Sequence, residues 1–270
     1  MANDLTTEEK QKNSPVTEDT DLFESEDSVT GVNEEMLREM IGVGLWYGRR
    51  KTKTQPKMKP YILTNRSGVE IIDVAKTVGF MEKATGFLKD IFAKKGTILF
   101  VATQPAAKAA VEELAKKYKM PYVTNRWLGG TLTNFATLSK RVDYFKKLKT
   151  DRAAGTLQKY TKKEQTHFGK EIERLDTLFS GVEDMTKLPD VVFVVNPVMH
   201  DIVVREANKM KIPVVALVST DADPDKITYI IPGNDSAPLS VNWVLAKVDA
   251  TMRDASTMNA AVGIEPAVKA

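Results

Sequence analysis

The sequence contains no cysteine and only two histidines among its 270 residues. Without cysteine the chain can form no disulfide bond and no thiolate metal site, a composition that suits a protein of the reducing cytosol. It also lacks an apolar run long enough to span a bilayer, and its N-terminus lacks the basic and then apolar pattern of a signal peptide. We therefore expect a soluble cytoplasmic protein with no membrane partner.

Motifs for catalysis and nucleotide binding are also missing. His167 and His200 lie in different regions of the chain, and we expect His200 to lie beside solvent at the start of a helix. The chain has no Gly-x-x-x-x-Gly-Lys loop, and the apolar run 97–102 is followed by Thr-Gln-Pro-Ala instead of a glycine-rich turn. These absences predict that the chain is no enzyme and has no catalytic residue, cofactor or small-molecule substrate.

One acidic cluster is a candidate cation site. Asp221, Asp223 and Asp225 follow the apolar run 213–218, and three spaced carboxylates can bind a hard cation. Residues 222–225 also have the composition of a good turn. We favour the turn and predict no metal site.

The net charge of +3 hides an uneven distribution. Acidic residues dominate residues 1–35, and residues 1–33 are so poor in apolar residues that we expect a disordered acidic arm. This arm would serve solubility or, alternatively, act as an interaction tail. Lysine and arginine gather instead at 49–66 and 140–170, and such clusters point towards a polyanionic partner. The alternative is a solvated basic surface with no partner, which is the usual role of such residues on a helical hairpin.

Apolar runs alternate with helical patterns over much of the chain. We expect strands at 69–73, 97–102, 121–124, 191–195, 213–218 and 228–231, and helices at 34–47, 74–93, 105–118, 200–210 and 238–252. Continuous apolar runs are typical of strands buried on both faces of a parallel sheet. The pattern predicts an α/β, Rossmann-like or flavodoxin-like domain built from 34–131 and 181–252, with a disordered tail at 253–270.

The segment 132–180 interrupts this alternation. Apolar residues recur there at helical spacing in two stretches, beginning at Phe135 and at Phe168, and residues 151–156 suit a turn between them. Thr161 and Glu164 have the spacing of a capping box at the start of the second helix. We predict an antiparallel, coiled-coil-like helical hairpin that projects from the sheet domain.

The two basic regions contain most of the candidate contacts with phosphate. Residues 48–60 hold two prolines and many cations, so we expect an extended loop whose cations act as point charges. The candidates in and after this loop are Arg49, Arg50, Lys51, Lys53, Lys57, Lys59 and Arg66. Those of the hairpin are Lys140, Arg141, Lys146, Lys147, Lys149, Lys162 and Lys163.

A further candidate contact lies in the stretch 125–135. Arg126 and Trp127 place a cation and a flat aromatic face beside Gly129 and Gly130, an arrangement suited to phosphate contact and base stacking. The alternative is an ordinary strand-to-helix turn in which Trp127 anchors the core and Arg126 is solvated.

Several phrases together resemble one family, the second protein of the bacterial small ribosomal subunit. They follow the family's order over residues 36–252 and read PKMKPY (56–61), NRWLGGTLTN (125–134), GT (155–156), LQKYTKKE (157–164), LPD (188–190), EAN (206–208), IPVVA (212–216), DPD (223–225) and IPGND (231–235). The resemblance implies a Rossmann-like domain with a projecting coiled-coil hairpin. It also implies a structural role in translation, with small-subunit ribosomal RNA bound between head and body. Other small-subunit proteins would be partners, including the large mRNA-binding first protein, which family members help to dock.

The chain departs from this family at two places. The family usually carries two histidines near residue 46, where this chain has Trp46 and Arg49, so no metal is expected there. The family's histidine before Arg-Trp is Asn125 here, which keeps hydrogen bonding and loses a titratable group.

Two other functions compete with RNA binding. An α/β enzyme or sugar-phosphate binder would hold its ligand near Thr103 or Asp221, at the carboxyl ends of the strands. A protein scaffold would dock another helix on its hairpin with little sensitivity to salt. If the chain binds RNA, replacing Lys57 and Lys59 together should weaken binding and flatten its dependence on salt.

Overall fold

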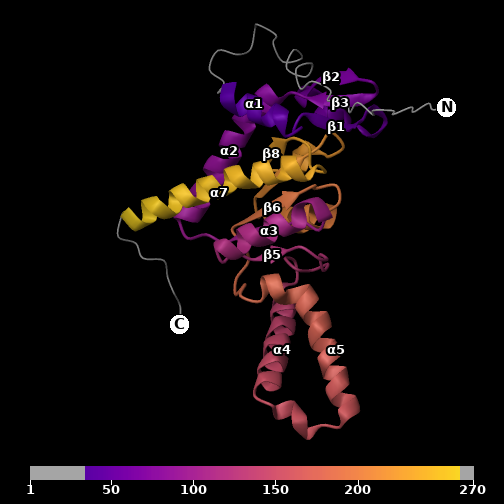
Figure 1. Cartoon of the computed structure of the whole chain (residues 1–270), viewed down its shortest axis with the longest axis vertical. Coiled ribbons are helices and arrows are strands. Elements are labelled where there is room, and N and C mark those ends of the chain that lie inside the picture. The colour runs from indigo at the N-terminus through magenta and orange to yellow at the C-terminus, as the bar shows by residue number, and fades with distance from the viewer. Residues whose placement is uncertain (1–33, 262–270) are drawn as a thin grey trace, which may run out of the picture.

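A computed structural model describes residues 34–261 (Figure 1). The expectations of a disordered arm at 1–33 and of a disordered tail over 262–270 fall outside the described residues. The helices are α1 Glu34–Gly42, α2 Val74–Ala93, α3 Pro105–Lys117, α4 Phe135–Ala153, α5 Lys162–Phe179, α6 Asp201–Lys209 and α7 Pro238–Ala261. The strands are β1 Tyr47–Arg50, β2 Ile62–Arg66, β3 Val69–Ile72, β4 Ile98–Val101, β5 Tyr122–Val123, β6 Val191–Val195, β7 Val214–Val218 and β8 Tyr229–Pro232.

The centre of the molecule is a five-stranded parallel sheet in the order β5-β4-β6-β7-β8. Its inner strands are buried along their whole length, and their side chains alternate between two apolar cores. Ile98 and Phe100 face the core shared with α1, α2, α3 and α7, whereas Leu99 and Val101 face the core on the α6 side. The expected parallel α/β sheet is therefore confirmed.

The strand order changes direction between β4 and β6. From β4 the chain moves outward to β5, and it then returns to place β6 on the other side of β4. A crevice at the carboxyl ends of such a strand pair is the usual ligand site of an open α/β sheet. Residues 103 and 196–200, which follow these two strands, therefore decide whether this chain has such a site.

A second, smaller sheet was not expected. β1, β3 and β2 form an antiparallel sheet with β3 in the middle, so the strand expected at 69–73 does not belong to the parallel sheet. Ser67 and Gly68, both at positive φ, form the tight turn that reverses the chain between β2 and β3. The helix expected at 34–47 ends at Gly42, because the chain must turn before β1.

The small sheet packs on the carboxyl ends of β7 and β8. The Arg49 N–H donates to Thr220 Oγ1 at 2.9 Å, and the Asn234 N–H donates to the Leu45 carbonyl at 2.9 Å. A Cβ at Gly48 would lie 2.7 Å from the Glu70 carbonyl oxygen and from Thr220 Cγ2, so this approach requires glycine. The loop expected at 48–60 instead consists of β1 and short 3-10 turns at Lys51–Lys53 and Pro56–Tyr61.

Helices α4 and α5 extend side by side away from the sheet (Figure 1). The expected capping box is present, with Thr161 accepting from the Glu164 N–H and the Glu164 carboxylate accepting from the Thr161 N–H. Helix α4 continues to Ala153, so the turn lies later than expected and uses Gly155 at φ 70°. Buried residues at the base of the pair share one apolar core with Leu99 and Val101 of β4, which anchors the hairpin to the sheet layer.

The last helix is longer than its sequence pattern indicated. We expected it to end near Met252 and a disordered tail to begin at 253, but α7 continues to Ala261. Met252 and Ala255 are both fully buried, so the packed stripe of the helix extends past the expected end. Within residues 34–261, no helix has both the length and the hydropathy needed to cross a membrane.

Candidate nucleic-acid interface

The loop that carries Arg126 and Trp127 is held by a single carboxylate. Glu206 on α6 accepts hydrogen bonds from Trp127 Nε1–H, from the backbone N–H groups of Gly130, Leu132 and Thr133, and from the Thr133 hydroxyl, over 2.8 to 3.2 Å. Burial raises the pKa of Glu206, but these hydrogen bonds outweigh it and hold the pKa below its usual value. The backbone amides of Gly130, Leu132 and Thr133 are therefore already bound to a carboxylate of the protein itself.

This arrangement separates the roles of Arg126 and Trp127. The Trp127 ring is partly buried against the apolar core on the α6 side, as expected for the core-anchor alternative. Arg126 is exposed and has no ion-pair partner among the described residues. The neighbouring Asn125 donates from Nδ2 to the Thr177 carbonyl at 2.8 Å, so it links the loop to the end of α5. Of the two candidates, Arg126 is the one free to meet a phosphate.

Several candidate cations are engaged within the protein. Lys149 lies 2.9 Å from a Glu183 oxygen, which raises the pKa of the lysine, and its Nζ is 4.8 Å from the centre of the Phe145 ring. Lys146 pairs more loosely with Asp184 at 3.9 Å. Lys57 contacts Asp225 at 2.6 Å and Asp223 at 3.1 Å. These lysines must give up a carboxylate, or share it, before they bind a phosphate.

Arg49 is the most deeply engaged candidate. Its Nη2 lies 2.8 Å from Asp235 Oδ1 and its Nε lies 3.4 Å from Asp221 Oδ2. Burial raises the pKa of Asp235 to about 6; the guanidinium lowers this pKa and the Asp221 carboxylate raises it. With 29% of its side chain exposed, Arg49 joins β1 to the loops after β7 and β8. Arg49 therefore forms ion pairs that stabilise the fold.

The remaining candidates are exposed cations. Arg66, at the end of β2, is exposed but makes further interactions and is therefore set apart from the others. The other exposed candidates have no acidic partner among the described residues. This exposed set consists of Arg50, Lys51, Lys53, Lys59, Arg126, Lys140, Arg141, Lys147, Lys162 and Lys163.

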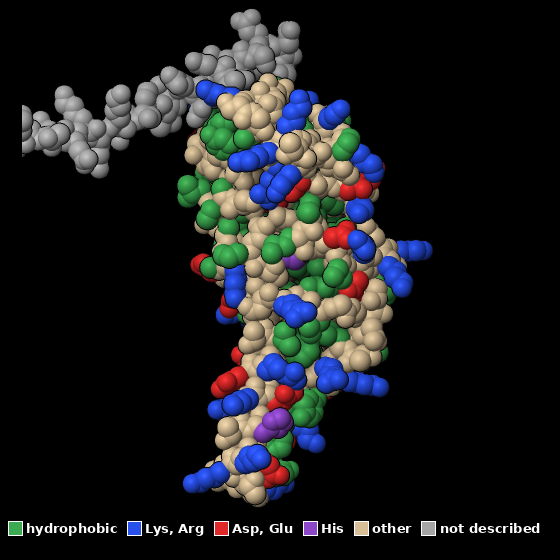
Figure 2. All heavy atoms as spheres, turned by 90° about the vertical axis from the view of Figure 1, so that its right-hand side faces the viewer, with side chains coloured by type: hydrophobic (Ala, Val, Ile, Leu, Met, Phe, Trp, Pro, Cys, Tyr) green, Lys and Arg blue, Asp and Glu red, His purple; other side chains and the backbone are tan. Residues whose placement is uncertain are grey.

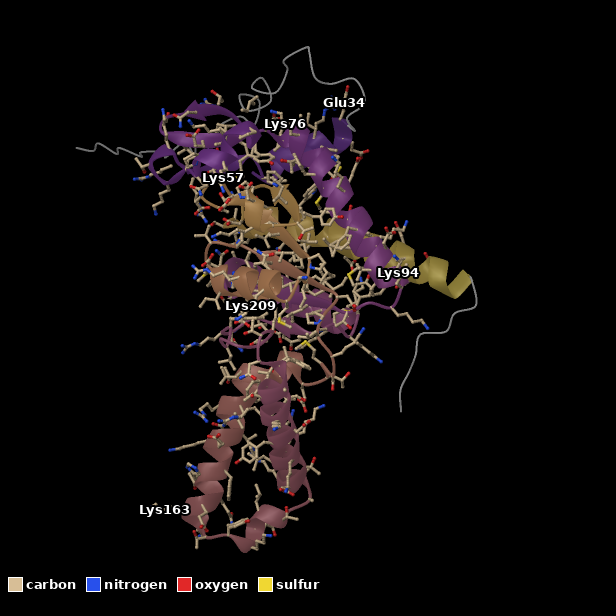
Figure 3. All side chains as sticks on the ribbon, turned by 180° about the vertical axis from the view of Figure 1, so that it is seen from behind. Glu34, Lys57, Lys76, Lys94, Lys163 and Lys209 are labelled. Atoms are coloured by element: carbon tan, nitrogen blue, oxygen red, sulfur yellow. The ribbon has the colours of Figure 1, made fainter. Side chains whose placement is uncertain are left out.

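The basic residues form two regions at opposite ends of the molecule. Residues 48–66 carry seven Lys or Arg and no acid, and residues 132–180 carry eleven Lys or Arg against six Asp or Glu. Lys57 of the first region and Lys163 of the second are far apart along the long axis (Figure 3). Figure 2 shows Lys and Arg side chains spread over the hairpin and over the opposite end of the same face.

The acidic loop after β7 forms the turn that we favoured. Asp223 Oδ1 accepts from the Asp225 N–H at 3.3 Å and caps the short helix Pro224–Lys226. Its three carboxylates are paired with Arg49 or Lys57. Within residues 34–261, no group of three or more His, Cys, Asp or Glu side chains is arranged to hold a metal ion.

The ligand crevice of the sheet is occupied by His200, which is 4% exposed and not beside solvent as we had expected. Its Nε2 accepts from the Thr103 N–H at 3.2 Å, so Nδ1 carries the proton and donates to the Asn196 carbonyl at 2.9 Å. Burial lowers the pKa of this imidazole. The backbone N–H of Thr103, two residues after the end of β4, is thus bound to His200 and is not free to bind a phosphate.

Sequence reasoning missed Glu206 and His200 as organising residues. Glu206 offered one signal, because it is a charged residue beside the buried stripe formed by Val203, Val204 and Ala207 on α6. Sequence spacing reveals neither the loop partners of Glu206, which lie 73 or more positions away, nor Thr103, which lies 97 positions from His200.

Comparison with known families identifies the family of the chain. The family described as Ribosomal protein S2 matches residues 40–255, which covers the small sheet, the parallel sheet and the hairpin. This is a family of structural proteins of the small ribosomal subunit that act in translation, and it is not an enzyme family. The resemblance drawn from the sequence phrases is confirmed, and the chain belongs to the ribosomal protein S2 family.

Proposed function

We propose that the protein binds ribosomal RNA of the small subunit through its two basic regions, and that it does so between the head and the body of the subunit. The observation that carries this proposal is the set of exposed cations that have no acidic partner among the described residues and that gather towards opposite ends of the molecule. When such a cation neutralises a phosphate, a counterion bound to the RNA is released. This release is the main source of affinity in contacts of this kind.

The separation of the two regions supports a bridging role. Arg50 at the end of β1 and Lys51, Lys53 and Lys59 in the 3-10 turns that follow are exposed on the small-sheet side. The hairpin that carries the other cations extends away from the parallel sheet (Figure 1). A single RNA helix would not need cations at both ends of an elongated protein. Two separated RNA segments, such as those of two subunit domains, match this arrangement.

We further infer that α4 and α5 pack as a short antiparallel coiled coil, inserted at 132–180 into a sheet domain of residues 34–131 and 181–252. The spacing of their buried residues supports this packing. On α4 these are Leu138, Val142, Phe145 and Leu148, and on α5 they include Ile172, Leu175 and Phe179. A stiff arm of this kind holds its outer cations in fixed positions.

RNA binding is tested by titrating the purified chain against small-subunit ribosomal RNA at several salt concentrations. We expect the logarithm of the binding constant to fall steeply with the logarithm of the salt concentration. Affinity that does not change with salt would contradict the proposal. It would favour the scaffold function, in which the hairpin docks another protein.

We also propose that the protein works on cytoplasmic ribosomes and helps to dock the large mRNA-binding first protein of the subunit. This proposal rests on the family of the chain. Its test is whether that first protein is lost from small subunits depleted of this chain and returns when the chain is added back. Unchanged retention of the first protein would contradict it.

A further inference from the structure

A groove of about 270 Å³ lies at the base of the hairpin, between α4, α5 and the loop before α4. Leu138 and Leu175 form part of its floor and are 9% and 4% exposed, so this floor belongs to the packed core. Leu178 is partly exposed and continues the same apolar surface. The groove thus offers a preformed apolar surface at the root of a basic arm.

Two consecutive glycines, Gly129 and Gly130, line one side of the groove. A Cβ at Gly129 would have no neighbouring atom within 4 Å, and Gly130 follows at φ 90°. The Gly130 N–H is bound to Glu206 at 2.8 Å, which fixes the position of this wall. The opening is therefore a built feature of the loop and does not depend on a side chain moving away.

The rim of the groove is cationic on both helices. Arg141 on α4 is exposed and has no ion-pair partner among the described residues, while Arg174 on α5 contacts Glu171 at 2.8 Å on its own helix. A guanidinium group can donate two hydrogen bonds to two oxygens of one phosphate, and it can stack on a planar ring. An apolar floor between two arginines suits a ligand that is flat, apolar on its faces and negatively charged at its edges.

Two polar side chains at the groove are available to such a ligand. Asn134 occupies the N-cap position of α4, yet its side chain makes no capping hydrogen bond. The Thr137 hydroxyl also has no hydrogen-bond partner within the described part of the chain. An amide and a hydroxyl both donate and accept, as the edge of a nucleobase requires.

We propose that this groove binds one unpaired nucleotide of RNA. Its base would lie on the surface formed by Leu138, Leu175 and Leu178, with its edge toward Asn134 and Thr137. The flanking phosphates would contact Arg141 and Arg174. Unpaired bases that leave the RNA stack are the usual targets of specific recognition by proteins. This inference rests on the proposed RNA binding and adds a selective contact to its electrostatic ones.

The test fills the groove without removing charge. Gly129 lines the groove and lies outside the positive-φ region, so Gly129→Leu adds a large side chain at the groove without backbone strain. Gly79→Leu on α2 is the matched control, because a Cβ there also meets nothing within 4 Å. Small subunits are isolated through an affinity tag on each form of the protein, and base reactivity is mapped along their ribosomal RNA by chemical modification.

We expect Gly129→Leu to raise the reactivity of an unpaired nucleotide severalfold, and Gly79→Leu to leave the map as in wild type. Arg141→Gln with Arg174→Gln should expose the same nucleotide. An identical map in all these subunits would overturn the groove proposal while leaving the proposed function intact. Loss of a neighbouring protein without any change in the map would also overturn it. If the wild-type protein isolates no small subunits, the proposed function fails and the groove proposal falls with it.

Discussion

The indole Nε1–H of Trp127 donates to Oε1 of Glu206 at 3.1 Å, and this bond joins the Gly-Gly loop to helix α6. The same carboxylate also accepts three backbone amides and a hydroxyl of the loop. Two phrases that carry the family resemblance, 125–134 and 206–208, therefore meet in space. Their contact shapes the base of the hairpin.

Replacing Glu206 by Gln should destabilise the protein by about 1–3 kcal/mol, because an NH₂ group would face backbone donors in place of an acceptor. Urea unfolding at pH 7 measures the change. The folded-state pKa of Glu206 is depressed, so the stabilisation is present above pH 4.5 and is lost as pH falls through the folded pKa. The difference between wild type and variant should therefore shrink in acid, and a constant difference would contradict this account.

The exposed cations of the small sheet should contribute more to RNA binding than the paired ones. Lys51→Gln, Lys53→Gln and Lys59→Gln together should lower the salt slope by about 0.7 to 0.9 for each lost phosphate contact. Lys57→Gln alone should lower it less, since Lys57 is already paired with Asp223 and Asp225. Filter binding across a salt series compares the two variants, and equal slopes for wild type and the triple variant would remove the small sheet from the interface.

Asp235 should make the protein less stable as pH rises from about 4 to about 6. Its folded pKa of about 6 lies above the ordinary value of 3.8, so the folded state retains a proton that the unfolded state has lost. The ionised carboxylate costs up to roughly 3 kcal/mol at neutral pH by this shift. Asp235→Asn should flatten this part of the stability curve.

Unfolding by urea between pH 4 and pH 7 gives that curve. The matched control is Asp225→Asn, which removes an exposed carboxylate of the neighbouring loop instead of a buried one. If Asp235→Asn and Asp225→Asn change the slope equally, the burial of Asp235 is not its cause.

His200 should act in the opposite direction. Because burial lowers its pKa, the unfolded state binds the proton more readily, and stability should fall as pH decreases below about 6.5. His200→Gln can still accept from the Thr103 N–H and donate to the Asn196 carbonyl, so it should keep the fold and reduce this decline. A decline as steep in the variant as in wild type would contradict the prediction.

The parts of the fold that rest on local pattern were predictable from the sequence. The uninterrupted apolar residues of β6 and β7 indicated buried parallel strands, and Thr161 with Glu164 indicated the start of α5. The small sheet was not predictable, because β2 has four exposed residues out of five and so shows no alternation. The extension of α7 depends on Met252 and Ala255 being buried by other helices, which no local pattern reveals.

The sequence predicts where the basic residues of the candidate site cluster, but not which of them are paired with acids. Both basic regions were evident, since clustered lysines and arginines are visible in the sequence. Which of these cations stay free depends on acids brought close by folding, such as Asp235 beside Arg49 and Glu183 beside Lys149. Sequence separations of 186 and 34 positions hide these pairs from any local reading.

The central claim is that this protein is an integral, RNA-bound component of the small ribosomal subunit. Its most direct test is to express a tagged form in bacterial cells that lack a competing copy and to fractionate the ribosomes on a gradient after a moderate salt wash. We expect the protein to stay in the small-subunit peak. A protein that remains at the top of the gradient would contradict it.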